Sequence, residues 1–487
     1  MDERRSCSYC NLEYMSEDER TEHLAESHDF DELSRLDRKR VEQHRHERLI
    51  ETTTSRFQGY VTRRAMIATI GVGAVAGIVG LTGQASASFA GGDGDAGDPF
   101  QIETWDHLNN IPDGTDDHFI LNTDLDEDTE GYEGIGDDWD PIDDFIGEFD
   151  GNGKTISDLV IDRPAESRVG LFGFLGGDSE SVTVKNIALT NVDIQGDSRV
   201  GGLAGEVESG GGIGVIEQVA VEGTIAGEGR VGGVVGESFE YGGEITESYV
   251  LGEVLGVGSG NGIGGVVGAS GRFFSGHSIE RCFVAANVSA PDSSQVGGLV
   301  GRTSFDGSIE DCYVIGNVTG DTTVGGVVGD TSSNGTSFEN VYAAGEVNGD
   351  DAGGLYGSTG GSDTYTANYW DEDTTSQNAA VGDGSTPSGT EGLGTDEVQG
   401  ETPLPTADGG DNTMDGFDFT DEWHAVIQGE AINPTPTDDG YPILQAIDIE
   451  TQLRAQEIFR RDASIVVEGD DLTVSNSTVR TGDDEDE

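Results

Sequence analysis

The sequence predicts a mainly β protein built around a parallel β-solenoid of about seven coils. A glycine-rich phrase recurs seven times between Val169 and Gly357, as in Val231-Gly-Gly-Val-Val-Gly236, with starts 28 to 33 residues apart. A second phrase, such as Ile309-Glu-Asp-Cys-Tyr-Val314, keeps step with the first, and its apolar residues alternate as in a short strand. A period of about 30 residues that is kept with this fidelity is typical of a stacked repeat array.

Each repeat is expected to form one coil that stacks on its predecessor. Each strand would then pair in parallel with its copy one repeat earlier, at a separation of about 4.8 Å. The paired glycines suit places where the backbone turns tightly or approaches the next coil closely. A Greek-key β-sandwich is the alternative, but it does not require one side-chain pattern to return every 28 to 33 residues. We therefore favour the solenoid.

The repeated phrases also carry a family resemblance. Val296-Gly-Gly-Leu-Val-Gly301, with its partner Ile309-Glu-Asp-Cys-Tyr-Val-Ile-Gly-Asn-Val-Thr-Gly320, resembles the GLUG motif of bacterial and archaeal surface proteins. Segments that resemble the lead-in and closing segments of such proteins are Phe145–Leu159, Asn368–Asp371 and Asp439–Leu444. The resemblance covers roughly residues 98–447. It implies a right-handed parallel β-helix on a cell surface, often adhesive, without a known catalytic centre.

Acidic residues far outnumber basic ones. The 487 residues include 94 Asp and Glu against 25 Lys and Arg, which gives a formal net charge of −69. Such a surface repels nucleic acid and anionic lipid, so no nucleic-acid partner is favoured. Disorder is another interpretation of high charge, but the regular apolar positions argue against it within the repeats. We interpret the acidity as a solvated surface suited to high salt, where screening reduces self-repulsion, and expect an extremely halophilic archaeon as the source.

Changes in composition give the expected domain boundaries. They are a zinc-finger-like segment (1–30), a charged helical linker (31–61), an export signal or membrane anchor (62–90), N-terminal strands and a cap (91–168), the repeat β-helix (169–373), a linker (374–416), and a closing segment with an acidic tail (417–487).

The N-terminal segment has the ligand types and spacing of a C2H2 zinc finger. Cys7 and Cys10 are followed by His23 and His28, so two thiolates and two imidazoles can form a tetrahedron around Zn²⁺. The alternative is a coincidental cluster in a flexible arm. Residues 1–30 contain nine acidic residues and three arginines, which disfavours phosphate contacts. We therefore expect a protein-contact or regulatory finger.

An export signal is expected next. Arg63 and Arg64 precede a run of mostly Gly, Ala, Val and Ile from residue 65 to residue 83, which resembles a twin-arginine (Tat) signal. Ala85-Ser86-Ala87 offers a cleavage site of small residues. The competing interpretation is an uncleaved membrane span, because the run is just long enough to cross a bilayer. In either case the charge distribution places the N-terminal segment in the cytoplasm and the repeats outside.

Several residues of the mature region are candidates for modification. Cys282 and Cys312 occupy equivalent places in adjacent coils, where stacked strands would bring them within disulfide range. The competing interpretation, which we favour, is that the two cysteines are small apolar residues in an interior column. The glycosylation sequon occurs at Asn287, Asn317, Asn334 and Asn476.

A calcium site is a weaker candidate. Residues 124–130 superficially resemble a Ca²⁺ loop, but Thr129 stands where an EF-hand requires Gly, and no Glu falls at the twelfth place. The general acidity of the chain explains this segment better.

Three classes of function compete. A surface or adhesive protein would bind a glycan or a protein with its long flat faces. A polysaccharide-active β-helix enzyme would need an acid/base pair on one face, and abundant Asp and Glu leave no pair distinguished. A membrane-tethered zinc-finger regulator would use the solenoid as an external sensor. We favour a non-enzymatic exported surface protein whose ligand the sequence does not identify, since no distinctive aromatic track is evident.

Overall fold

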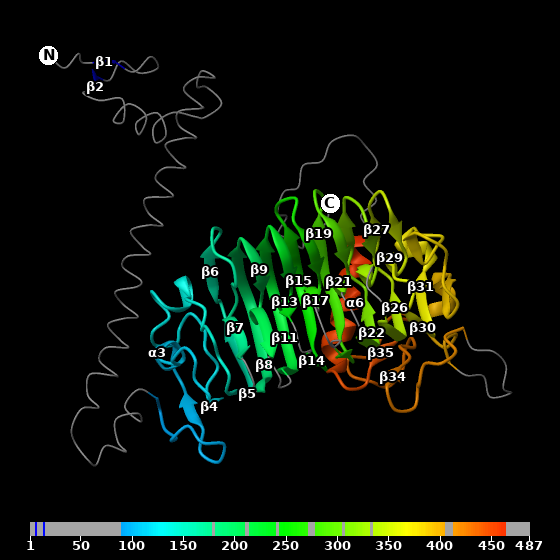
Figure 1. The fold of residues 1–487 in the computed structure, drawn as a ribbon. Coiled ribbons are helices and arrows are strands. Elements are labelled where there is room, and N and C mark those ends of the chain that lie inside the picture. Colours follow the sequence, from blue (N-terminus) through cyan, green and yellow to red (C-terminus); the bar gives the residue numbers. More distant parts are fainter. Residues whose placement is uncertain are drawn as a thin grey trace, which may run out of the picture. The chain divides into compact units, whose positions relative to one another are not determined.

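The computed structural model describes Arg5–Ser6, Glu13–Tyr14 and residues 89–463, apart from residues 178–180, 210–213, 240–242, 271–277, 304–306, 332–334 and 405–412. The chain separates into two compact units, Met1–Thr82 and Gly83–Glu487. In the first unit, β1 (Arg5–Ser6) pairs antiparallel with β2 (Glu13–Tyr14). The second unit contains the predicted parallel β-solenoid, whose strands stack side by side along its length (Figure 1).

Each central coil contributes strands to three faces, named here in the order in which the chain visits them. The first face contains β3 (Phe100–Ile102), β4 (His118–Leu121), β5 (Glu148–Ser157), β6 (Val160–Arg163), β8 (Val182–Gly196), β11 (Gly214–Gly227), β14 (Gly243–Thr246), β15 (Tyr249–Gly256), β18 (Ser278–Glu280), β19 (Phe283–Ala290), β22 (Ser308–Val314), β23 (Val318–Gly320), β26 (Ser337–Ala343), β27 (Val347–Asn348), β30 (Thr364–Thr366), β31 (Asn368–Asp371) and β33 (Thr390–Leu393).

The second and third faces are narrower. The second face contains β9 (Ser198–Gly201), β12 (Gly229–Gly232), β16 (Asn261–Gly264), β20 (Ser294–Gly297), β24 (Val324–Gly325) and β28 (Ala352–Gly353). The third face contains β7 (Phe172–Gly177), β10 (Ala204–Ser209), β13 (Val235–Phe239), β17 (Val267–Ser270), β21 (Val300–Thr303), β25 (Val328–Thr331), β29 (Tyr356–Thr359) and β32 (Val381–Asp383). These eight strands of the third face mark about eight turns.

Equivalent residues of successive repeats pair directly. Val231 pairs with Val200 of the preceding coil and with Ile263 of the following coil, in parallel register. Like side chains therefore form columns along the stack, as the repeat period predicts.

The three glycines of the repeated phrase are required by close backbone contacts. A Cβ atom at Gly232 would lie 2.1 Å from the backbone oxygen of Val235. One at Gly233 would lie 2.2 Å from a carbonyl oxygen of the next coil, and one at Gly236 would lie 2.4 Å from a backbone nitrogen of the preceding coil. Side chains do not fit at these distances, so six of the seven phrases keep glycine at all three positions.

Two corners of the coils use residues other than glycine in the left-handed region of φ, which costs about 1–2 kcal/mol per residue. The first corner column, within the first face, has φ between 48° and 56° at Asn186, Gln218, Glu247, Arg281, Asp311, Asn340 and Ala367. The second corner column, just before the repeated phrase, has φ between 53° and 68° at Arg168, Arg199, Arg230, Gln295 and Thr323. The side chains at both corners point outward in columns, and they are described below.

The interior is one continuous apolar cluster. Valine, isoleucine and leucine dominate the central coils, whereas rings fill the N-terminal end. Successive ring centroids of Phe100, Phe119, Phe145 and Phe172 lie 5.6, 5.9 and 5.1 Å apart. The short helix α3 (Trp105–Asn109) buries Trp105 at this end, and η3 (Gly136–Asp138) follows it.

The C-terminal end differs from the sequence prediction. Residues 374–416 were expected to be a linker, but β32 pairs in parallel with β29, and β33 pairs in parallel with β31, so this segment extends the stack. Two short helices, α4 (Glu372–Thr375) and α5 (Thr395–Val398), accompany these strands. Each of the two strands has only three or four residues, too few to show an alternating pattern against the Gly, Ser and Thr around them.

Candidate interaction surfaces

An aromatic ladder runs along the outside of the first face. Tyr249, Phe283, Tyr313, Tyr342 and Tyr369 pair in register in five successive coils. Their first four rings stack with centroid separations of 5.0, 5.1 and 5.1 Å and interplanar angles of 12°, 7° and 4°. The expectation of no aromatic track was therefore wrong. The signal was present in the second phrase, which places Tyr or Phe at this position in four consecutive repeats.

The C-terminal residues 413–463, named here the strap, cover this ladder. The strap contains β34 (Trp423–His424), which pairs antiparallel with β35 (Ile443–Leu444), and α6 (Ile449–Ala463), which packs against β19 (Figure 1, orange to red). The Trp423 ring lies 6.1 Å from that of Tyr313 and 5.8 Å from that of Tyr342. Rings of the ladder and the strap form a second apolar cluster, separate from the solenoid interior.

Buried polar contacts fix the strap in place. The Tyr313 hydroxyl donates to Gln452 Oε1 at 2.9 Å, and the Tyr342 hydroxyl donates to the Pro442 carbonyl at 2.5 Å. The Tyr441 hydroxyl donates to Asp371 Oδ2 at 2.8 Å. This last bond joins the two segments that resemble GLUG-protein closing segments, one ending at Asp371 and the other containing Tyr441.

Carboxylates gather where the edge of the strap meets the first corner column. Trp423 Nε1 donates to Asp311 Oδ1 at 2.9 Å, and Asn340 Nδ2 donates to the same oxygen at 3.1 Å. Burial raises the pKa of the Asp311 carboxyl, although these two hydrogen bonds lower it in part. Burial also raises the pKa of Glu310 and of Glu422, and neighbouring carboxylates add to both shifts.

The second corner column carries a ladder of alternating charges at its N-terminal end. Arg168 Nε lies 2.5 Å from Glu206 Oε2, and Arg199 Nε lies 3.6 Å from that oxygen and 2.6 Å from Glu237 Oε2. Arg230 Nε lies 3.1 Å from Glu237 Oε1. Both glutamates are buried, with side chains 4% and 8% exposed, so the guanidinium groups compensate charges that would otherwise be costly.

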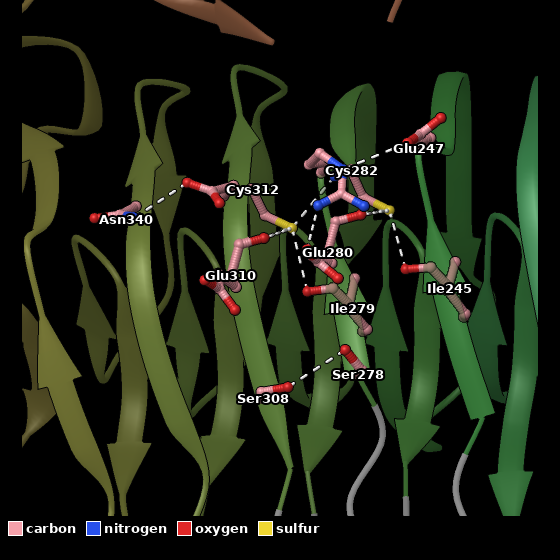
Figure 2. Close-up of polar contacts among 12 residues, drawn as sticks. Ile245, Glu247, Ser278, Ile279, Glu280, Cys282, Ser308, Glu310, Cys312 and Asn340 are labelled. Carbon is pink, nitrogen blue, oxygen red and sulfur yellow. Dashed lines mark hydrogen bonds and ion pairs between the residues drawn. The ribbon is translucent and has the colours of Figure 1, made fainter. Parts of the chain in front are cut away.

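The two cysteines lie in an interior polar column beside the first corner (Figure 2). Both are buried free thiols. The Cys282 thiol donates to the carbonyls of Glu280 and Ile245, and the Cys312 thiol donates to those of Glu310 and Ile279. The backbone N–H of Cys282 donates to Cys312 Sγ at 3.4 Å.

The cysteine column has polar counterparts in other coils. The Val219 N–H donates to Ser248 Oγ at 3.0 Å, and the Val341 N–H donates to Asn368 Oδ1 at 3.2 Å. In each case a small polar side chain of one coil satisfies a backbone donor of the coil before it, which explains why polar residues are tolerated in this interior position.

Two of the four sequon asparagines are described, and both lie in another column of the first face. Asn287 Oδ1 accepts from the Asn317 backbone N–H at 3.3 Å, and Asn317 Oδ1 accepts from the Glu346 N–H at 3.0 Å. Their side-chain oxygens therefore link neighbouring coils. Asn334 and Asn476 lie outside the described residues, and glycosylation stays a prediction for all four.

Some of the remaining predicted sites also lie outside the described residues, and one lies within them. The zinc ligands Cys7, Cys10, His23 and His28, and the export residues Arg63 and Arg64, lie outside the described residues. In the loop considered for Ca²⁺, Asp124 Oδ1 accepts from the Thr155 N–H and Asp126 Oδ1 accepts from the Thr129 hydroxyl, so both carboxylates are used within the fold.

No metal cluster marks a site within residues 89–463 as far as they are described. No group of three or more His, Cys, Asp or Glu in this part has metal-binding geometry. A cavity of about 10 Å³ lies between coils, beside Val207, Ile216 and Ile245, and has room for one water at most. Among the same residues, no helix combines the length and apolar character needed to cross a membrane.

Comparisons with known proteins support the repeat assignment. Residues 292–319 match the family model of the GLUG motif, which confirms the motif predicted from the repeated phrases. A protein of Evansella cellulosilytica, provisionally named as a Gly-rich membrane protein, is 38% identical over 150 residues, which are 29% of this chain and 16% of that protein. Halomucin of Haloquadratum walsbyi is 31% identical over 144 residues, 28% of this chain and 2% of that protein. The chain thus spans a small part of either relative.

A solved structure also matches part of this chain. It is a crystal structure from Bacteroides ovatus, provisionally described as an immunoglobulin A1 protease, with 22% sequence identity and a TM-score of 0.45. The match covers 74% of this chain and 96% of that one.

Proposed function

We propose that this protein is an exported, non-enzymatic cell-surface protein that binds a glycan or protein ligand through the faces of its solenoid. The observation that carries the proposal is the solenoid itself, because about eight stacked turns with a packed interior present long, regular outer faces to a partner. The GLUG motif and relatives named as a membrane protein and a halomucin support a surface role.

Cell fractionation tests the location. Cell fractions are probed with one antibody against residues 1–50 and a second antibody against the solenoid. The second antibody should detect the solenoid on the cell surface or in the medium. If Ala85-Ser86-Ala87 is cleaved, the two antibodies detect separate species; if residues 65–83 stay as an anchor, they detect one membrane-bound species. Replacing both Arg63 and Arg64 with Lys should hold the solenoid in the cytoplasm. Recovery of the wild-type solenoid in the cytosol would reject the surface assignment.

The N-terminal segment is proposed to hold one Zn²⁺ through Cys7, Cys10, His23 and His28. Native mass spectrometry of the full chain should show one zinc ion, which is lost in the Cys7→Ser variant and retained in a Ser8→Ala control. A wild-type chain without zinc at neutral pH would reject the finger.

A polysaccharide-active enzyme is the second candidate. The observation that favours it is Glu310, whose raised pKa is the property that a general acid needs, with the Glu280 and Glu339 carboxylates in adjacent coils. Incubation with acidic and neutral polysaccharides distinguishes the two. Binding without new chain ends supports the binder, whereas new chain ends that disappear in Glu310→Gln support the enzyme.

A further inference from the structure

The strap is held by two kinds of contact that respond differently to solution conditions. Over the centre of the ladder, the contacts are stacked rings and hydrogen bonds between neutral groups, such as Tyr313 to Gln452 and Tyr342 to Pro442. At the edge that contains Trp423, the contacts involve carboxylates on both sides. This edge, with the first-face residues that it faces, is named here the acidic seam.

The acidic seam has a large excess of negative charge. On the solenoid side the charged groups are Glu247, Glu280, Arg281, Glu310, Asp311 and Glu339, and on the strap side they are Asp418 and Glu422. Among the described residues of the seam, seven carboxylates thus surround one guanidinium. Arg281 forms an ion pair with Glu280 and lies 3.5 Å from Glu247, so its charge is already engaged within the solenoid.

Like charges face one another across the seam itself. Burial raises the pKa of the Glu422 carboxyl of the strap, and the Asp311 and Glu280 carboxylates of the solenoid raise it further, whereas Arg281 lowers it. Asp311 is 5% exposed and accepts the indole N–H of Trp423, so the strap is anchored directly on a buried carboxylate. Repulsion between these groups opposes docking of the strap, and dissolved cations reduce it.

Dissolved salt strongly changes the repulsion between the carboxylates of the strap and those of the solenoid. The Debye length is about 3 Å at 1 M salt and about 30 Å at 0.01 M salt. Strands of adjacent coils lie about 4.8 Å apart. Repulsion between exposed carboxylates on them is therefore largely screened in molar salt and felt in dilute salt, whereas the charge of the buried Asp311 is screened much less.

The solenoid beneath the strap depends much less on this seam. Its interior cluster is separate from the cluster of the ladder and the strap, and its coils are joined by continuous parallel backbone pairing. The ladder rings also stack on one another, independently of the strap. Loss of the strap would therefore expose a formed aromatic surface on a folded stack.

We propose that the strap is a salt-dependent cover, which stays docked while dissolved cations screen the acidic seam and lifts from the aromatic ladder in dilute salt. The solenoid stays folded during this change. An ion pair, Arg454 with Glu222 at 3.8 Å, joins α6 to the solenoid away from the seam. Because both groups are well exposed, we expect it to contribute little.

Hydrogen exchange of the full chain, followed by mass spectrometry over a KCl series, tests the proposal. On going from molar to hundredth-molar KCl, amides of the strap should exchange at least about tenfold faster, while those of β11, β19 and β22 change little. Exchange that accelerates together in the strap and the solenoid would overturn the proposal, because it would mean global unfolding. A strap that stays protected at every salt concentration would overturn it as well.

Two variants and a control connect the effect to the seam. Glu422→Gln removes a strap carboxylate that is repelled by Asp311 and Glu280, so the salt effect on strap amides should fall to about threefold. Arg281→Ala removes the single cation, so lifting should begin at higher salt. Glu253→Gln removes an exposed carboxylate from the first face outside the seam and should leave the wild-type response unchanged. A response to Glu253→Gln as large as that to Glu422→Gln would show a general charge effect and overturn the assignment to the seam.

Discussion

The N-terminal and C-terminal halves of the first face share one backbone plan but present different outer surfaces. At the position of the aromatic ladder, the coils of β8 and β11 have Ala188 and Ala220, whereas the next coils have Tyr249 and Phe283. The second corner column is charged in the N-terminal half, where three arginines accompany buried glutamates. In the C-terminal half it has the uncharged residues Gln295 and Thr323. The interior pattern is therefore kept along the repeats, whereas the outward residues differ between the two halves.

The largest effect should come from removing a central ring of the covered half. Tyr313→Ala deletes a fully buried ring that touches two ladder neighbours and Trp423, so we expect a loss of about 3–5 kcal/mol in the free energy of unfolding. Thr224→Ala, on the outside of β11, should cost less than about 0.5 kcal/mol. Denaturant unfolding at constant high salt measures both. Equal costs would remove the distinction between the two halves.

The charged column of the N-terminal half should give the next largest effect. Arg199→Ala leaves Glu206 and Glu237 each with one fewer guanidinium, which we expect to cost about 2 kcal/mol. The equivalent residue of a later coil, Gln295, donates to Asp330 at 2.7 Å, and Gln295→Ala should cost about 1 kcal/mol. Thermal unfolding of the two variants compares the columns directly. A smaller loss for Arg199→Ala than for Gln295→Ala would contradict the role given to the arginines.

The Trp423→Phe variant tests how far the hydrogen bond between the strap and Asp311 stabilises the covered half. The phenyl ring keeps most of the contact with Tyr342, but the Asp311 carboxylate loses its indole donor, which should cost about 1–2 kcal/mol of strap docking. Hydrogen exchange should show this loss in strap amides and not in β8 or β11. An equal loss of protection in both halves would mean that the strap supports the whole solenoid.

The smallest effect is that of pH. Burial at the contact between the strap and the solenoid raises the pKa values of Asp311 and Glu422 above their ordinary values of 3.8 and 4.5. Docking is therefore penalised at neutral pH, and the penalty disappears as the pH falls through the raised values towards the ordinary ones. After correction for intrinsic exchange rates, strap amides at low salt should be more protected at mildly acidic pH than at pH 7. Weaker protection at acidic pH would contradict the sign of these shifts.

The sequence was sufficient for the part of the structure that repeats. The glycines of the phrase mark close backbone contacts, and the alternating valines and isoleucines mark the interior, so period and fold class followed directly. The left-handed corners were not predictable, because Arg281, Asp311 and Asn340 have no common side-chain chemistry and share only a backbone conformation.

Contacts between distant segments could not be predicted from the sequence either. Tyr313 and Gln452 are 139 residues apart, and nothing in the local pattern around either residue indicates the other. The aromatic ladder could have been recognised from Tyr249, Phe283, Tyr313 and Tyr342 in equivalent positions, but its cover could not. The last coil was missed because Val381 and Leu393 are its only strand residues that are large, apolar and buried.

Direct stacking of coils also determines how such a chain can change in length. Duplicating the unit around β11 would add about 4.8 Å and one more alanine on the N-terminal side of the ladder, without separating any ladder residue from the strap. Duplicating the unit around β22 would instead move Tyr342 one step away from Pro442 and Trp423. Growth of the array should therefore be tolerated on the N-terminal side of Tyr249 and resisted beyond it.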